Sequence, residues 1–316
     1  MLFFKTIVLA MAKIAGLGVI GYALAKSNIL TTKVNRALVT LIIYVTLPLF
    51  IISEIVGKFD FQQYPLWWMY PLLSIVITLV GCFFALMHLR VIPKKHSPLE
   101  RRQIISLVAF QNAGYLPLII AAELFAPEVA EELFVHIFLF LIGFNLLVWS
   151  VGARFLCGSS MRDLRIGNLF SPPGVAIVVS LLAVFFGLGR LIPAQVLHYT
   201  HGIGKLTLPL AMIAIGANLA YVSLRNVDRK VITAVSVIKL IVLPVCAIVV
   251  LVVWKLPELL GFLILIELAV PSATSLSLIV GRYNIEDKYI SQGVFFTHIA
   301  SIVTIPIFLI IFHLLR

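Results

Sequence analysis

Long apolar segments separated by short polar stretches run through this chain from one end to the other. Ten of them approach the roughly 20 residues that a helix needs to cross a bilayer. They cover about residues 4–25, 37–56, 66–90, 104–123, 133–157, 172–190, 205–222, 231–254, 258–281 and 293–315. Strands of a membrane barrel are only about half as long, so these segments predict transmembrane helices.

The composition excludes a water-soluble domain. Of the 316 residues, 62% are hydrophobic and 12% are charged, and the mean hydropathy is +1.13. A soluble globule of this size could not cover so much apolar side chain, and a disordered chain or a collagen-like fibre is excluded on the same ground. We therefore expect an all-α integral membrane protein with ten transmembrane helices, placed as a multi-pass protein in the plasma (inner) membrane.

Basic residues in the loops predict the orientation. Loops after odd-numbered segments hold sixteen, namely Lys26, Lys33, Arg36, Arg90, Lys94, Lys95, Arg101, Arg102, Arg154, Arg162, Arg165, Arg225, Arg229, Lys230, Arg282 and Lys288. Loops after even-numbered segments hold four, namely Lys58, Arg190, Lys205 and Lys255. Because Lys and Arg stay on the cytoplasmic side, both termini are expected outside the cytoplasm. This distribution also explains the net charge of +11 without a nucleic-acid partner.

A weak internal repeat divides the chain in two. The tetrapeptide Thr-Leu-Pro-Leu occurs at residues 46–49 and again at 207–210, 161 positions later. Because each half holds five segments, the second half must enter the membrane in the opposite direction. We therefore expect two inverted five-helix repeats, residues 1–157 and 172–316, as in many secondary transporters.

The same offset relates two interruptions of long apolar segments. Segment four is broken by Gln-Asn-Ala-Gly-Tyr-Leu-Pro at 111–117, and segment nine by Pro-Ser-Ala-Thr-Ser at 271–275. Proline opens a helix, and the freed backbone groups must face a polar cavity rather than lipid. A helix that restarts there presents free N–H groups suited to an anion. The expected substrate-binding residues are Asn112, Ala113, Gly114, Pro117, Pro271, Ser272, Thr274 and Ser275, although a simple proline kink without a ligand is the alternative.

Three stretches then resemble the auxin efflux carrier family. Glu267 to Asn284, centred on Pro271, is similar to the family's ninth, crossover helix, which ends in an aromatic-Asn or aromatic-Gly pair. Residues 111–118 resemble its first crossover, and residues 239–244 resemble its eighth span. Plant carriers have a second proline where this chain has Leu276, and their long hydrophilic centre is absent here.

This resemblance covers the whole chain and implies several properties. It implies a scaffold of spans 1, 2, 6 and 7, a transport unit of spans 3–5 and 8–10, and a homodimer. It implies small organic anions as substrates, either an auxin-like indole acid or a dicarboxylate. A sodium-coupled symporter of the bile-acid type and a non-transporting membrane sensor with the same fold are the alternatives.

Ionisable residues within a span are costly and are functional candidates. Glu267 lies one turn before Pro271 and is a candidate for binding a proton or a cation or for a charge pair with Lys239, and a structural hydrogen bond to a neighbouring span is the alternative. Lys239 could instead snorkel to the interface. Lys13 has no assigned function, and lining the scaffold and pairing with a carboxylate are the alternatives for it. His198 and His201 form an H-x-x-H pair that is expected in an outer loop and has no third ligand, so no metal site is expected. No catalytic constellation is found, so we expect neither an enzyme nor a cofactor.

Overall fold

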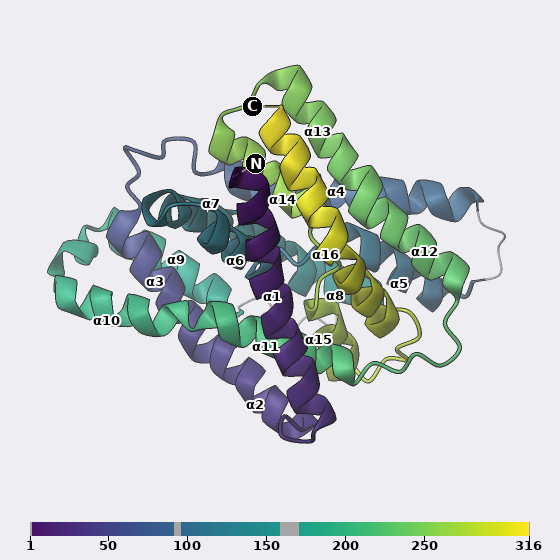
Figure 1. The fold of residues 1–316 in the computed structure, drawn as a ribbon. Helices are drawn as coiled ribbons and strands as arrows, with labels where there is room; N and C mark the ends of the chain where they lie inside the picture. The colour runs from purple at the N-terminus through teal and green to yellow at the C-terminus, as the bar shows by residue number, and fades with distance from the viewer. Residues whose placement is uncertain (1, 92–95, 159–170, 316) are drawn as a thin grey trace.

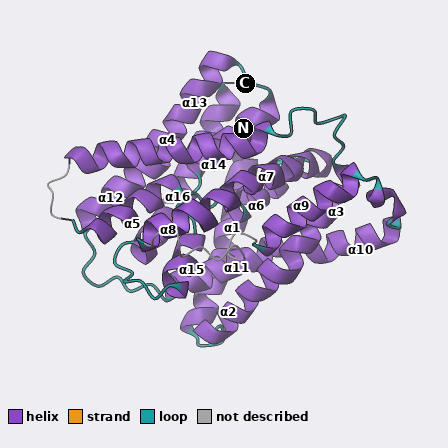
Figure 2. Ribbon diagram, turned by 180° about the vertical axis from the view of Figure 1, so that it is seen from behind, coloured by secondary structure: helices purple, strands orange, loops and turns teal. Residues whose placement is uncertain are grey.

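The computed structural model describes residues 2–91, 96–158 and 171–315, and within them the chain forms a bundle of helices (Figures 1 and 2). No β-strand occurs in these three ranges, where the isolated extended pairing is one bridge between Gln111 and Ser272. The predicted all-helical architecture is therefore confirmed. The basic loop residues Lys94, Lys95, Arg162 and Arg165 lie outside the described residues.

The helices follow the chain in two comparable series. The first is α1 (Leu2–Lys26), α2 (Thr32–Leu41), α3 (Leu47–Lys58), α4 (Met69–Val91), α5 (Pro98–Ala109), α6 (Tyr115–Leu124), α7 (Pro127–Leu147) and α8 (Ala153–Cys157). The second is α9 (Pro172–Phe185), α10 (Ala194–Lys205), α11 (Thr207–Ala220), α12 (Arg229–Val237), α13 (Leu243–Trp254), α14 (Glu258–Ala269), α15 (Ser275–Arg282) and α16 (Ile290–Leu314). A short 3₁₀ turn, Leu188–Leu191, follows α9.

Seven helical segments of the described ranges are long and apolar enough to cross a membrane. They are Phe4–Lys26, Thr32–Lys58, Met69–Arg90, Pro127–Cys157, Ala194–Ala220, Arg229–Trp254 and Ile290–Leu314. Large apolar side chains stand exposed on their outer faces and on the shorter α9, for example Val253 at 62% and Phe185 at 67%. Such surfaces are unfavourable in water and favourable in lipid. The protein is therefore a multi-pass membrane protein.

Wide, π-helical turns join several of these helices. Ile42–Thr46 joins α2 to α3, Val148–Gly152 joins α7 to α8, and Ile238–Val242 joins α12 to α13. The first and third stand directly before Leu-Pro pairs at Pro48 and Pro244. Proline clashes with the carbonyl four residues earlier, and a wider turn relieves this clash without ending the helix. These two prolines thus bend continuous helices.

Several boundaries differ from the sequence prediction, and two of them have a clear physical reason. The seventh segment was expected at 205–222, but α10 begins at Ala194 and only Leu206 separates it from α11. Gly204 sits where a Cβ would lie 2.5 Å from the Phe50 backbone, so this glycine serves helix packing and does not mark a loop. The fifth segment was expected at 133–157, but α7 begins at Pro127. Its first turn carries Glu128, which favours a helix N-terminus.

Helices α1 and α11 approach closely where they cross (Figure 1). A Cβ added at Gly216 would lie 1.9 Å from the Gly18 carbonyl oxygen, and one added at Gly21 would lie 2.0 Å from the Ile213 carbonyl oxygen. Only glycine permits two helix backbones to meet at this distance. The glycines of α1 that face α11 are therefore packing residues.

Candidate functional site

The two expected helix breaks are present and lie against each other. Helix α5 ends at Ala109 and α6 begins at Tyr115, while α14 ends at Ala269 and α15 begins at Ser275. Pro271 stands inside the second break, whereas Pro117 stands in the first turn of the restarted helix α6. The breaks thus correspond in position, but their prolines do not.

The extended residues of the two breaks pair as a minimal antiparallel bridge. Gln111 faces Ser272, the Asn112 N–H donates to the Pro271 carbonyl at 2.8 Å, and the Ala273 N–H donates to the Phe110 carbonyl at 2.9 Å. Adding 161 to the donor's number in the first bond gives the donor of the second, and subtracting 161 from the acceptor's number in the first gives the acceptor of the second. Each break therefore satisfies the backbone groups that the other exposes.

The carbonyl groups freed at the end of α5 have further partners. The Ser272 hydroxyl donates to the Leu107 carbonyl at 2.6 Å, and the Lys239 ammonium donates to the Val108 carbonyl at 3.3 Å. A cation is favourable at a helix C-terminus, where the last carbonyl groups lack helical partners. Lys239 is 1% exposed and is thus a buried partner of the first break rather than a snorkelling residue.

Helix α16 holds both breaks from one side. Asn112 Nδ2 lies 3.2 Å from His298 Nε2, and His298 Nδ1 lies 2.8 Å from the Val294 carbonyl. The carbonyl can only accept, so Nδ1 carries the proton of the neutral ring and Nε2 accepts from Asn112. The neighbouring Thr297 accepts from the Ser272 N–H at 3.3 Å. Sequence reasoning did not identify His298 as a functional residue, since a single histidine on an apolar helix carries no distinguishing pattern.

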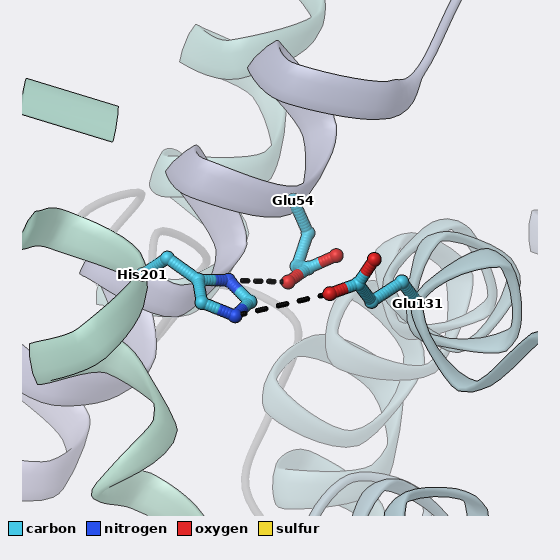
Figure 3. Close-up of side chains that lie close together, drawn as sticks. All are labelled: Glu54, Glu131 and His201. Carbon is cyan, nitrogen blue, oxygen red and sulfur yellow. Dashed lines mark ion pairs between the residues drawn. The ribbon is translucent and has the colours of Figure 1, made fainter. Parts of the chain in front are cut away.

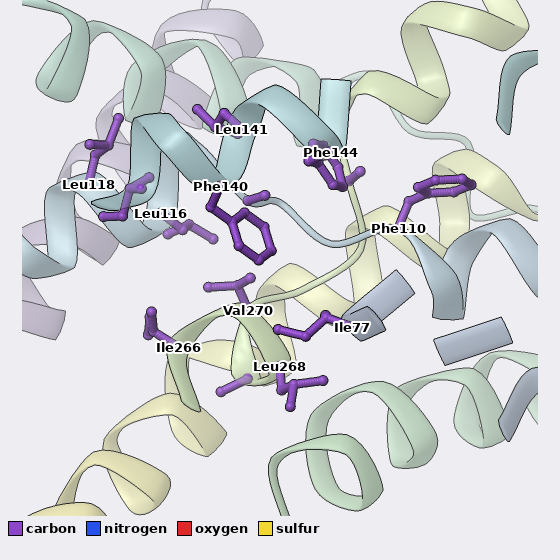
Figure 4. Packing of buried hydrophobic residues seen from close by; sticks show 14 of the residues in the cluster. Ile77, Phe110, Leu116, Leu118, Phe140, Leu141, Phe144, Ile266, Leu268 and Val270 are labelled. Carbon is purple, nitrogen blue, oxygen red and sulfur yellow. The ribbon is translucent and has the colours of Figure 1, made fainter. Parts of the chain in front are cut away.

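Apolar side chains surround the crossing. Figure 4 shows Phe110 from the first break, Leu116 from the start of α6 and Val270 from the second break among buried side chains of neighbouring helices. Phe110 also meets Phe144 of α7 edge-on, with ring centroids 6.2 Å apart. This packing keeps water from the backbone bridge and holds the two breaks in a fixed relation.

The starts of α6 and α15 open onto a cavity of about 110 Å³. Its lining includes five of the eight expected binding residues, namely Asn112, Ala113, Gly114, Thr274 and Ser275, together with Gln111, Tyr115, Asn145 and Trp149. Pro117, Pro271 and Ser272 do not line it. The remaining wall is largely apolar and comes from span two, α7 and α9.

At the N-terminal ends of α6 and α15, some backbone N–H groups are free to bind a ligand. The N–H groups of Ala113 and Ser272 are engaged, the first by the Gln111 carbonyl and the second by Thr297. By contrast, the N–H groups of Gly114 and Thr274 form no hydrogen bond with any other described residue, and neither helix start has a side-chain cap. Free donors at a helix N-terminus favour an anionic group.

A second, larger cavity of about 290 Å³ adjoins the first. It lies between α2, α11, α15 and α16, and both cavities are lined by Thr274 and Leu278. Arg36 is the one cation among its described lining residues, and this side chain makes no ion pair within the described ranges. Asn35 and Asn218 meet on its wall, with the Nδ2–Oδ1 distance at 2.7 Å. Arg36 and the crossing thus line two neighbouring cavities that share the wall residues Thr274 and Leu278.

Glu267 and Lys239 lie beside the crossing but outside the cavity. Glu267 is fully buried, and the Gln111 amide and the Lys239 ammonium are the polar groups that act on its carboxylate. No ion pair within 4.0 Å joins Glu267 to Lys239, and neither carboxylate oxygen has a well-formed hydrogen bond with a described residue. The two ionisable side chains therefore share one buried region without direct contact.

Lys13, which had no assigned function, pairs with a carboxylate. Its ammonium lies 2.7 Å from Glu123 Oε2, so the ion pair joins α1 to the end of α6. The Lys13 side chain is 67% exposed, and in lipid an unpaired ammonium at this depth would be costly. The ion pair is a sufficient reason for a lysine in the first span.

A multi-pass helical bundle with two broken helices around a partly polar cavity has the organisation of a membrane transport protein. Comparison with known proteins agrees. The model of a family described as membrane transport protein matches residues 6–165 and 158–309. The chain therefore belongs to that family, the auxin efflux carrier family, and the resemblance found in its sequence is confirmed.

A curated relative points the same way. The chain is 26% identical over 299 residues to the uncharacterized transporter MJ1031 of Methanocaldococcus jannaschii. The match covers 91% of this chain and 93% of the relative. Family and relative thus indicate a transporter rather than an enzyme.

Proposed function

We propose that the protein is a secondary transporter of small organic carboxylates that works by alternating access at the two crossed breaks. The observation that carries this proposal is the pair of uncapped helix starts facing one cavity. A carboxylate there would accept from the Gly114 and Thr274 N–H groups and from the Asn112 amide. Two positive helix ends that converge in a dry site stabilise one negative charge without a buried lysine.

The proposed architecture has ten spans in two inverted repeats, residues 1–157 and 172–316. Two observations support this. The donors of the two backbone hydrogen bonds at the crossing are 161 positions apart, and so are their acceptors. The broken helices α5 and α14 also begin and end about 160 positions apart. Spans 1, 2, 6 and 7 would form the scaffold, and spans 3–5 and 8–10 the transport unit. A homodimer joined through the scaffold completes this proposal.

The larger cavity is the proposed cytoplasmic entrance. Arg36 lies in α2, close to the connection after the first span, and the basic residues there favour the cytoplasmic side. Its guanidinium would attract a carboxylate, which then passes Thr274 on its way to the crossing. Both termini would lie outside the cytoplasm. A reporter that is active only in the cytoplasm should therefore stay silent when fused after Arg316, and strong activity would contradict this orientation.

Flux in proteoliposomes tests the proposed function. Labelled indole acetate and labelled dicarboxylates are supplied outside vesicles that contain the purified protein. Transport predicts that at least one acid accumulates inside and that unlabelled acid of the same kind competes. Binding of an acid without flux would identify a sensor instead, and flux that appears only with a sodium gradient would favour a sodium-coupled symporter.

A further inference from the structure

Three side chains from separate helices converge away from the crossing. Glu54 comes from α3, Glu131 from the start of α7 and His201 from α10, and Figure 3 shows them pointing toward one another. His201 Nδ1 lies 2.7 Å from Glu54 Oε1, and His201 Nε2 lies 4.0 Å from Glu131 Oε1. One ligand atom from each residue lies within 4.8 Å of the other two.

The Glu54 carboxylate is incompletely satisfied at this place. The residue is 0% exposed, and its Oε2 has neither a hydrogen bond nor an ion pair with any described residue. Figure 3 places this carboxylate between His201 and Glu131. A buried carboxylate oxygen without a partner is costly, so the cluster lacks a positively charged or donating group at its centre.

The lysines nearby do not fill that centre. Lys58 forms an ion pair with Glu131 through Oε2, whereas the Glu131 oxygen that faces His201 is Oε1. Lys205 acts on Glu54 only at longer range. The Glu131 carboxylate is thus paired with Lys58, which lies outside the cluster, and the Glu54 carboxylate contacts His201 through one of its two oxygens.

We propose that Glu54, Glu131 and His201 bind a zinc ion. Carboxylate oxygen and imidazole nitrogen are ordinary zinc ligands, and three protein ligands leave a fourth position for water. Two carboxylates balance the charge of the ion. His201 and Glu131 are 22% and 19% exposed, which leaves a path for the ion to enter.

The sequence could not indicate this site. His198 and His201 alone suggest a histidine pair, but the cluster contains His201 and not His198. Its other members are 147 and 70 positions away along the chain, on α3 and α7. Because the ion would join three helices, it would stabilise their packing, and it would also supply the positive charge that the centre of the cluster lacks.

Zinc titration of the purified protein tests the proposal by calorimetry and by the melting temperature. The native protein should bind one zinc ion and melt at a higher temperature with zinc than without it. Glu54→Gln and His201→Gln should each abolish both effects. His198→Gln is the matched control on the same helix and should retain them.

Two further variants make the outcome decisive. Lys58→Met should bind zinc more tightly than the native protein, because the lysine competes with the ion for Glu131. If Glu54→Gln fails to fold, Glu131→Gln at the partly exposed ligand takes its place. Absence of zinc binding by the native protein, or equal binding by the native and ligand variants, would overturn the proposal and leave the cluster an ion-pair network.

Discussion

The hydroxyl of Thr207 donates a 2.8 Å hydrogen bond to the hydroxyl of Thr46, and both side chains are buried. The two residues hold the same place in the two Thr-Leu-Pro-Leu motifs, 161 positions apart. Gln111 and Ser272, which face each other at the crossing, are separated by the same 161 positions. If a pseudo-two-fold axis relates the halves, residues that touch their own equivalents lie on it. Both pairs therefore mark the proposed axis.

The Thr46–Thr207 bond should be visible in stability. Thr46→Val leaves a buried hydroxyl without its acceptor and should cost about 1 to 3 kcal/mol. The double variant Thr46→Val/Thr207→Val should cost less than the two single changes added together, since both polar groups are then replaced. Melting of the detergent-solubilised protein measures this. Additive effects would show that the bond contributes nothing.

At the crossing of α1 and α11, alanine substitutions at two glycines should have different effects on stability. Gly216→Ala places a Cβ against the Gly18 carbonyl and forces the helices apart, which should cost about 1 to 3 kcal/mol or more. Gly16→Ala is the matched control, because a Cβ there meets nothing within 4 Å. It should be neutral or stabilising by up to about 1 kcal/mol. Equal melting temperatures for the two variants would contradict the close approach.

The sequence predicted the helices and the two breaks well, because apolar length and proline both act locally. Asn112, Gly114 and Thr274, which line the smaller cavity, were predicted for that reason, and their role in binding stays a prediction. His298 was missed because its role depends on α16 lying beside the first break, which no local pattern encodes. The expected N–H donors at Ala113 and Ser272 are engaged by partners that only the crossing brings close. Arg36 was taken as an orientation signal, and its place on a cavity wall required the fold.

The start of α5 should respond to pH through Glu100. This residue forms a capping box with Ser97 and an ion pair with Lys288, and it precedes the apolar part of the fourth segment. The hydrogen bond from Lys288 is the main reason why the pKa of Glu100 lies below its ordinary value of 4.5. The same bond raises the pKa of Lys288 above its ordinary value of 10.5.

The direction in which stability changes with pH follows from these two pKa shifts. Because the pKa of Glu100 is lowered, its ionised carboxylate stabilises the fold above pH 4.5, and this stabilisation is lost as the pH falls through the lowered pKa. Because the pKa of Lys288 is raised, its ammonium stabilises the fold below pH 10.5, and this stabilisation is lost as the pH rises through the raised pKa. Glu100→Gln should therefore lower the melting temperature at neutral pH by a small amount, and the difference should vanish in acid. A difference that persists in acid would contradict this account.

Coupling is the role proposed for Glu267, whose carboxylate is buried beside the crossing and near Lys239. A carboxyl group that carries the coupled proton is needed for gradient-driven uptake but not for exchange of substrate across the membrane. Glu267→Gln should therefore retain counterflow and lose the pH dependence of uptake. Loss of both activities, or an unaltered pH dependence, would assign Glu267 to structure alone.

The central claim is that a carboxylate binds between the two helix breaks, and Asn112 tests it most directly. The Asn112 amide reaches this cavity while His298 fixes its orientation. Asn112→Ala should weaken carboxylate binding by about 1 to 3 kcal/mol, roughly a fivefold to 150-fold rise in Kd. The measurement is the Kd of the best-bound acid, by calorimetry on native and variant proteins of equal melting temperature. An unchanged Kd in a folded Asn112→Ala protein would contradict the assignment of the site.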